Sequence, residues 1–129
     1  MTTEILIVED DFANQQVARL FLKKFGYESE VVENGERAVE ATKHKKYSLI
    51  FMDCQMPVMD GFTATRSIRV TQGVNQRTPI IALTANLVNG INQQCRNSGM
   101  DDVICKPISM QGLKDITEKW IGKQSLVHY

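Results

Sequence analysis

The sequence predicts an α/β fold in which strands and helices alternate five times, a (βα)5 doubly wound parallel five-stranded sheet. Aliphatic runs of strand length recur along the chain, segments with helical periodicity separate them, and capping or turn residues stand at the junctions. Strands that alternate with helices pair in parallel through right-handed crossovers. All strands should therefore point their carboxyl ends at one edge of the sheet, and a functional site is expected there.

The first strand is predicted at residues 5–8, where a continuous aliphatic run indicates burial on both faces. A helix follows at residues 12–25 and can end at Gly26. We expect its inward stripe to consist of Ala13, Val17, Leu20 and Phe21. A short strand is predicted at residues 30–33, and Asn34 can cap the next helix. The inward residues of that second helix should be Ala38, Val39 and Thr42.

The third strand is predicted at residues 48–52, and Asp60 with Gly61 then opens a helix. One face of this helix holds Phe62, Thr65 and Ile68. A fourth strand at residues 79–83 precedes a less clearly patterned helix over about residues 86–97, which Gly99 closes. The fifth strand is predicted at residues 103–105, and Ser109 can cap the last helix. We expect the inner face of the last helix to hold Leu113, Ile116, Trp120 and Ile121.

Length and composition indicate a single domain over residues 1–129, with 43% hydrophobic residues to build one core. Acidic and basic residues balance at 15 each, which disfavours nucleic acid or an anionic membrane as a partner. No apolar run is long enough to span a membrane, so a cytoplasmic location is expected. Cys54, Cys95 and Cys105 lack C-x-x-C spacing, so we expect small buried hydrophobic residues rather than disulfides or a zinc site.

Polar residues stand where the predicted strands end. Glu9 and Asp10 follow the first strand, Asp53 follows the third, Thr84 the fourth and Lys106 the fifth. In an open α/β sheet, ligands bind outside the carboxyl ends of the strands, so these residues are candidates for one shared site.

The charges of these candidates predict a bound cation. Carboxylates about 5 Å apart repel by roughly 3 to 4 kcal/mol per pair at an effective dielectric constant near 20. Oxygen ligands that leave room for water suit Mg²⁺, and Mg²⁺ with Lys106 would balance the charges of Glu9, Asp10 and Asp53. A carboxylate can attack phosphorus to form an acyl phosphate, and Asp53 is placed for this reaction. Lys106 and the Thr84 hydroxyl could then hold phosphoryl oxygens.

Four stretches of the chain resemble one family in order and spacing. They are ILIVEDD at residues 5–11, FMDCQMPVMDG at 51–61, PIIALTAN at 79–86 and GMDDVICKP at 99–107. Together they resemble the response-regulator receiver domains of two-component systems, most of all the receivers of hybrid histidine kinases. The resemblance implies the flavodoxin-like receiver fold with strand order 2-1-3-4-5.

The resemblance also implies a role for each site residue. Asp53 would be the phosphoacceptor and Thr84 the switch hydroxyl, and Lys106 the site lysine. The metal, Mg²⁺ with Mn²⁺ as a possible substitute, would be held by Glu9, Asp10, Asp53 and the Gln55 backbone carbonyl. The Lys106–Pro107 peptide bond would be cis. The residues expected to modulate the reaction are Gln55, Asn86 and Val103.

The function implied is that of a phosphoacceptor in a phosphorelay. Asp53 would take a phosphoryl group from the phosphohistidine of a histidine kinase or a histidine phosphotransfer protein, and would lose it slowly. The domain by itself would not be an enzyme, although a parent hybrid histidine kinase would be, and it would be a monomer or weak dimer. Val103 stands where many receivers carry an aromatic residue that turns inward, which favours a phosphoryl relay with little conformational change.

Other classes of protein share parts of this pattern. A flavodoxin-type flavin binder needs backbone donors and hydroxyls after the first strand, where this chain has acidic residues. An aspartate-based phosphohydrolase would require Asp-x-Asp there, whereas the chain has Glu9, Asp10 and Asp11. A receiver-like module that binds partners without phosphorylation would not need the site residues, which are all present.

Overall fold

The structure is a computed structural model that describes residues 4–71, 73–85 and 90–126, with side chains described as far as residue 121. Strands and helices alternate throughout, which confirms the predicted α/β class. In chain order the elements are β1 (Glu4–Val8), α1 (Phe12–Lys24), β2 (Glu28–Val32), α2 (Gly35–His44), β3 (Leu49–Asp53), α3 (Gly61–Val70), β4 (Ile80–Thr84), α4 (Ile91–Ser98), β5 (Asp102–Cys105) and α5 (Met110–Leu126).

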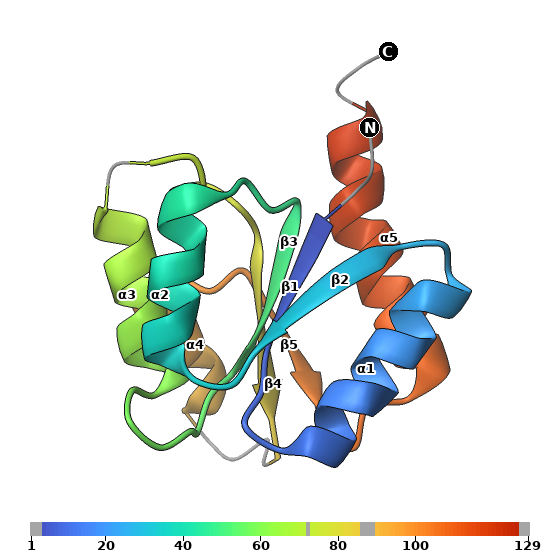
Figure 1. The fold of residues 1–129 in the computed structure, drawn as a ribbon, viewed down its shortest axis with the longest axis horizontal. Helices are drawn as coiled ribbons and strands as arrows, with labels where there is room; N and C mark the ends of the chain where they lie inside the picture. The colour runs from blue at the N-terminus through green and yellow to red at the C-terminus, as the bar shows by residue number, and fades with distance from the viewer. Residues whose placement is uncertain (1–3, 72, 86–89, 127–129) are drawn as a thin grey trace.

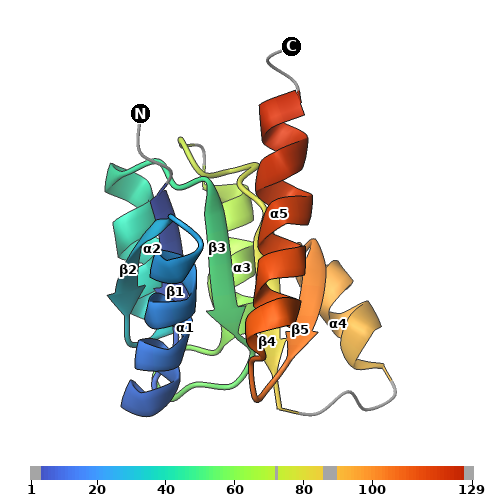
Figure 2. The same cartoon turned by 90° about the vertical axis from the view of Figure 1, so that its right-hand side faces the viewer.

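The strands form one parallel sheet in the order β2-β1-β3-β4-β5, as the resemblance implied. Figure 2 shows the arrowheads of β2, β3 and β5 pointing the same way. Asp53 ends β3 opposite Leu83, and Thr84 ends β4 opposite Cys105. The two polar residues are therefore the last residues of their strands, one position beyond the predicted strand ends, and they lie at the same edge of the sheet.

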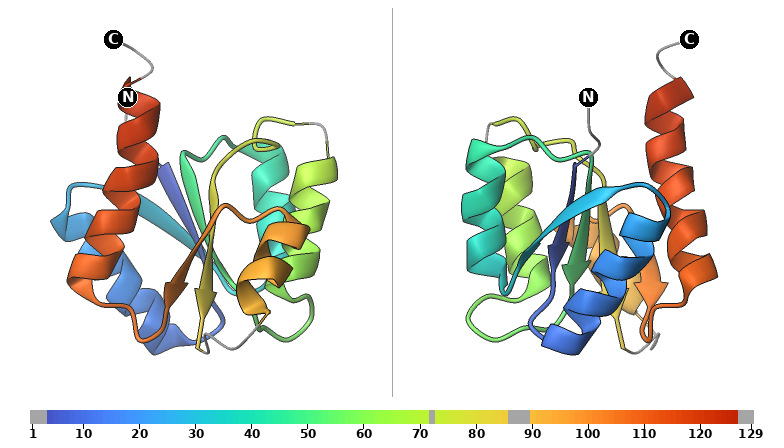
Figure 3. Two further views of the ribbon diagram at one scale, coloured as in Figure 1. Left: turned by 180° about the vertical axis from the view of Figure 1, so that it is seen from behind. Right: turned by 45° about the vertical axis from the view of Figure 1, so that its right-hand side comes forward.

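Helices cover both faces of the sheet: α1 and α5 lie on one side, and α2, α3 and α4 on the other (Figures 1 and 3). The side chains of β1 divide accordingly, because successive residues of a strand point to opposite faces. Ile5 and Ile7 pack with α1 and α5, whereas Leu6 and Val8 pack with the other three helices. All four are fully buried, which explains the uninterrupted aliphatic run of this strand.

The predicted helix caps are present. The side chains of Asn34 and Asp60 accept hydrogen bonds from backbone N–H groups in the first turns of α2 and α3. Ser109 Oγ accepts one from the Gly112 N–H at 3.0 Å at the start of α5. Gly99 closes α4 with a φ of 108°, a left-handed conformation that glycine adopts without strain. The inner faces predicted for α2, α3 and α5 are confirmed as well.

The stripe predicted for α1 is wrong except at Phe21, which packs against the core. Ala13 is exposed, and Val17 and Leu20 are 38% and 64% exposed. The buried residues are Ala18 and Leu22, with Phe21, Phe25 and Tyr27 partly buried against the same core. Apolar residues occur all around this helix, so two stripes of similar strength compete. Packing against β1 and α5, which sequence periodicity does not reveal, selects between them.

Two smaller predictions also differ from the structure. β2 begins at Glu28 rather than residue 30, because its pairing with β1 starts at Glu4. Cys54 and Cys95 are buried as expected, but Cys105 is exposed because it ends an edge strand. The predicted start of the fourth helix lies outside the described residues, and the described part of that helix runs over Ile91–Ser98. Across the described ranges, no helix combines the length and apolar character needed to cross a membrane.

Candidate functional site

A cleft of about 350 Å³ opens at the carboxyl edge of the sheet. All five residues predicted at the strand ends line this cleft, and Gln55 lines it as well. The five are Glu9, Asp10, Asp53, Thr84 and Lys106. The topology thus brings together residues from β1, β3, β4 and β5 that lie far apart in the sequence. The sequence analysis did not assign the remaining lining residues to the site, and these are Asp11, Asn14, Cys54, Ala85 and Ile91.

Asp53 is held in a fixed position inside this cleft, with only 4% of its surface exposed. Its Oδ1 accepts a hydrogen bond from the Gln55 backbone N–H at 3.1 Å. Its Oδ2 accepts one from Lys106 Nζ at 2.9 Å. Gly61 packs against the main chain of Asp53 so closely that a Cβ atom would collide with the carbonyl oxygen. The start of α3 therefore fixes the main chain that carries the carboxylate.

Lys106 joins two buried carboxylates. Its Nζ lies 2.7 Å from Glu9 Oε1 and 2.9 Å from Asp53 Oδ2. Its backbone N–H donates to the Thr84 carbonyl at 2.7 Å, which ties the end of β5 to the end of β4. Burial by itself lowers the pKa of Lys106, but the hydrogen bonds and charges of Glu9 and Asp53 outweigh it and raise the pKa. The side chain is therefore a stable cation in the site.

Glu9 is almost fully buried, at 1% exposed. Burial raises the pKa of its carboxyl from 4.5 to about 7, and the nearby Asp53 carboxylate adds to the rise. Hydrogen bonds from Lys106 and from the Asp11 N–H, the latter at 3.1 Å, oppose it. Glu9 Oε1 lies 2.7 Å from Lys106 Nζ, so the buried carboxyl is paired with a cation.

The donor set fits a hard divalent cation. Carboxylate oxygens of Glu9, Asp10 and Asp53 all lie within 4.8 Å of one another. Asp10 is exposed, so an ion bound there could keep water ligands on its open side. Mg²⁺ prefers one or two protein carboxylates with water and phosphate oxygens to complete its octahedron. The residues present therefore match the Mg²⁺ that the sequence predicted.

The remaining predicted site residues are placed as follows. The Lys106–Pro107 peptide bond is cis, as the resemblance implied. Val103 is half-buried in β5 and packs on the side of the sheet covered by α2, α3 and α4. Gln55 is exposed at the rim of the cleft. Asn86 lies outside the described residues.

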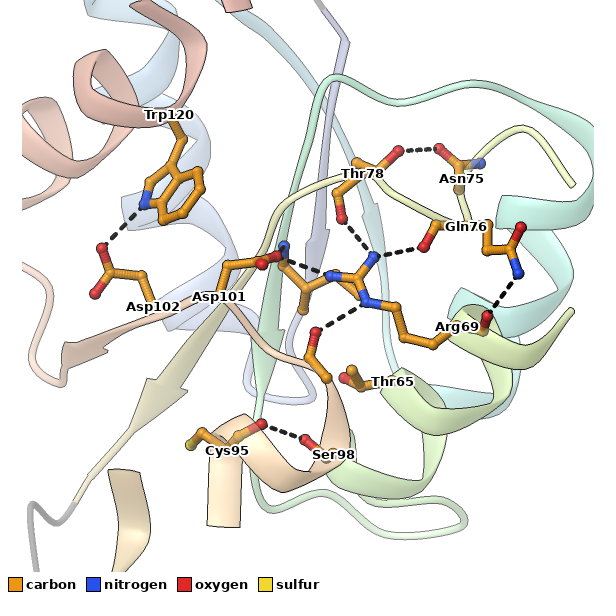
Figure 4. Close-up of polar contacts among 12 residues, drawn as sticks. Thr65, Arg69, Asn75, Gln76, Thr78, Cys95, Ser98, Asp101, Asp102 and Trp120 are labelled. Carbon is orange, nitrogen blue, oxygen red and sulfur yellow. Dashed lines mark hydrogen bonds and ion pairs between the residues drawn. The ribbon is translucent and has the colours of Figure 1, made fainter. Parts of the chain in front are cut away.

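A polar network that sequence reasoning missed lies at the other end of α3, beside the start of β4. The Arg69 guanidinium donates hydrogen bonds to the Gly99, Thr78 and Gln76 carbonyls and to Asp101 Oδ2, at 2.7 to 3.0 Å (Figure 4). Asp101 Oδ2 also accepts from the Ile80 N–H at 2.9 Å. This network joins the start of β4 to the ends of α3 and α4. No local sequence signal marks it, because its acceptors are mostly backbone carbonyls.

Comparison with known proteins gives a consistent result. Residues 5–118 match the model of the response regulator receiver domain. Hybrid signal transduction histidine kinase F of Dictyostelium discoideum is 38% identical over 120 residues, covering 91% of this chain and 11% of that protein. Kinase A of the same series and organism is 42% identical over 120 residues, covering 91% of this chain and 6% of that protein. The chain thus spans about a tenth or less of the length of these relatives.

Solved structures resemble the chain over nearly its whole length. The receiver domain of sensor histidine kinase PA1611 from Pseudomonas aeruginosa has a TM-score of 0.87 and 42% identity, covering 95% of this chain and 99% of that chain. That crystal structure has a magnesium ion coordinated in the active site cleft. A chain in the co-crystal structure of the Saccharomyces cerevisiae histidine phosphotransfer protein Ypd1 and the receiver domain of Ssk1 has a TM-score of 0.85 and 30% identity, with coverages of 95% and 91%. None of these similarities favours a flavin binder or a phosphohydrolase.

Proposed function

Because the chain belongs to the response regulator receiver domain family, we propose that Asp53 is its phosphoacceptor in Mg²⁺-dependent two-component signalling. One observation carries the proposal: the buried Asp53 carboxylate lies 2.9 Å from the Lys106 ammonium and beside the acidic residues Glu9 and Asp10. Attack by a carboxylate on phosphorus needs positioning and charge neutralisation more than it needs a proton-transfer base. This cleft offers both.

In the proposed reaction, an Asp53 carboxylate oxygen forms a bond to the phosphorus atom of a phosphohistidine as the phosphorus–nitrogen bond breaks. The electron pair of that bond stays on the imidazole, which takes up a proton from solvent. Lys106 and the Thr84 hydroxyl, both in the lining of the cleft, would hold phosphoryl oxygens. Slow attack by water on the same phosphorus would regenerate Asp53, so the domain by itself would be a phosphoprotein rather than an enzyme.

Glu9, Asp10, Asp53 and the Gln55 backbone carbonyl would hold Mg²⁺ in this proposal. When bound, the ion neutralises negative charge on the carboxylates and on the phosphoryl oxygens. The magnesium ion in the similar Pseudomonas aeruginosa domain supports this choice. Mn²⁺ accepts the same oxygen ligands and is the expected substitute.

The partner would be a protein that presents a phosphohistidine, either a histidine kinase or a histidine phosphotransfer protein. The similarity to hybrid histidine kinases supports the first, and the co-crystal of a similar receiver with Ypd1 supports the second. We propose a monomer or weak dimer that acts in the cytoplasm, with no contact to nucleic acid or membrane. If the chain is part of a hybrid kinase, the parent protein is the enzyme.

The modulating residues favour a relay over a strong conformational switch. Val103 has one stiff side-chain torsion and little surface to redistribute, so it offers few contacts that differ between two conformations. Gln55, at the rim of the cleft, and Asn86 would modulate the reaction. In this proposal the domain mainly passes the phosphoryl group to or from a partner histidine.

The test uses acetyl phosphate as a small phosphodonor. In the presence of Mg²⁺ the intact mass should rise by one phosphoryl group, and chelation of the metal or Asp53→Asn should prevent the rise. Asp11→Asn is the matched control, because Asp11 lines the same cleft and asparagine can also cap α1. Phosphorylation that persists in Asp53→Asn, or is lost in the control, would contradict the assignment.

A further inference from the structure

Three hydrogen bonds hold the acidic turn between β1 and α1, which consists of Glu9, Asp10 and Asp11. The Glu9 backbone N–H donates to the Val32 carbonyl at the end of β2, at 3.1 Å. The Asp11 N–H donates to Glu9 Oε2 at 3.1 Å within the turn. From α1, the side-chain amide of Gln15 reaches back and donates to the Glu9 carbonyl at 2.7 Å. The last contact is the shortest of the three.

Gln15 is well placed to hold this carbonyl. It lies in the first turn of α1, is half-buried, and its own N–H donates to the Asp11 carbonyl at 3.0 Å. The helix cap itself does not depend on the Gln15 side chain, because Asp11 Oδ1 accepts from the Asn14 N–H at 2.9 Å. The bond from the Gln15 amide therefore orients the turn rather than starting the helix.

The peptide plane that Gln15 holds is the one between Glu9 and Asp10. This plane fixes the directions in which both side chains leave the backbone, since each flanks it. The carboxylates of these two residues come within 4.8 Å of each other and of Asp53 despite their repulsion. Groups that orient metal ligands in this way typically change metal affinity when they are lost.

We propose that Gln15 is a positioning residue for the acidic pair, and that its bond to the Glu9 carbonyl sets the affinity for Mg²⁺ without touching the ion. The inference rests on the proposed function, because it assumes that Glu9 and Asp10 are the Mg²⁺ ligands. It assigns a role to a residue in α1 that lines no part of the cleft.

The experiment is a calorimetric titration of the full chain with MgCl2. Gln15→Met keeps the length and helix propensity of the side chain but removes the donor, and should weaken Mg²⁺ binding by about tenfold. Gln16→Met is the matched control: Gln16 is the next residue in α1 and is also half-buried, and it lines the grooves beside β2 rather than the cleft. The control should change Mg²⁺ affinity by less than about twofold.

A second variant separates positioning from simple electrostatics. Gln15→Glu places a carboxylate opposite the Glu9 carbonyl, where two acceptors repel, and also adds negative charge near the metal ligands. Positioning predicts weaker Mg²⁺ binding, whereas the added charge by itself predicts tighter binding. Tighter binding in Gln15→Glu, or unchanged affinity in Gln15→Met, overturns the proposal.

Phosphorylation kinetics provide a further readout that a general loss of stability would not reproduce. With acetyl phosphate, Gln15→Met should raise the Mg²⁺ concentration that gives half the maximal rate and leave the rate at saturating Mg²⁺ close to that of the wild type. If the wild type is phosphorylated at Asp53 but the variant shows no such shift, only the role of Gln15 fails. If the wild type neither binds Mg²⁺ nor is phosphorylated, the proposed function fails as well.

Discussion

The buried Glu9 carboxyl should make the stability of the metal-free protein fall as pH rises. Its pKa is raised from 4.5 to about 7, chiefly by burial, so the folded state binds a proton more tightly than the unfolded chain does. A raised pKa contributes stability that is fully present below the unfolded value and is lost as pH rises through the folded value. The sensitive window therefore runs from about pH 4.5 to pH 7.

The size of the effect follows from the same values. One pKa unit corresponds to about 1.4 kcal/mol, so this rise would remove on the order of 3 kcal/mol of unfolding free energy across the window. Urea unfolding of the EDTA-treated protein at several pH values between 4.5 and 8 measures it directly. Mg²⁺ should diminish the decline, because a cation at the acidic cluster stabilises the ionised carboxylate.

Glu9→Gln is the control for this prediction, because the amide has the same shape and does not titrate. Its metal-free unfolding free energy should change much less with pH across the same window. A wild-type stability that is flat or rises from pH 5 to pH 8 would refute the reasoning. An equal decline in Glu9→Gln would show that another group is responsible.

The remaining predictions test other parts of the molecule. Asp10→Ala should abolish Mg²⁺ binding in calorimetry. In urea its metal-free unfolding free energy should be unchanged or higher by about 1 kcal/mol, because the substitution relieves carboxylate repulsion. A clear loss of metal-free stability would show that Asp10 has a structural role. Arg69→Met should lower the unfolding free energy by about 2 kcal/mol, because it removes the half-buried guanidinium that donates to the Gly99 and Thr78 carbonyls. A loss under about 1 kcal/mol would show that the network adds little. Beryllofluoride, which mimics a phosphoryl group on Asp53, should shift amide NMR signals only around the cleft. If sedimentation instead shows tight dimerisation through α4, β5 and α5, the relay interpretation is contradicted.

The grouping of the candidate residues in one cleft was predictable because each carries a local signal. An aliphatic run that ends in an acidic residue marks the end of a buried strand, and Asp53 follows such a run. The parallel topology then places the ends of β3, β4 and β5 at one edge, so Thr84 and Lys106 join Asp53 in one cleft. Local pattern and general topology together were sufficient for this part of the molecule.

Other features depend on contacts that no local pattern encodes. Gln15 and Arg69 are polar residues in amphipathic helices, where most such side chains are solvated. Their acceptors are mostly backbone carbonyls, and in the case of Arg69 one of these, Gly99, lies 30 residues away. A carbonyl is present at every residue and so gives no sequence signal. The same reason explains the wrong stripe in α1, where Leu20 and Leu22 differ only in what packs against them.

The geometry also refines how the charges of the site are balanced. The sequence suggested that Lys106 and Mg²⁺ together balance the charges of Glu9, Asp10 and Asp53. In the structure, Lys106 is bound to the two buried ones, Glu9 and Asp53, whereas Asp10 is exposed to solvent. A buried carboxylate without a partner is costly, so this pair needs its cation at all times, but a solvated carboxylate does not. This arrangement would let the protein stay folded while the proposed Mg²⁺ binds and leaves, which is what a site with a reversibly bound metal requires.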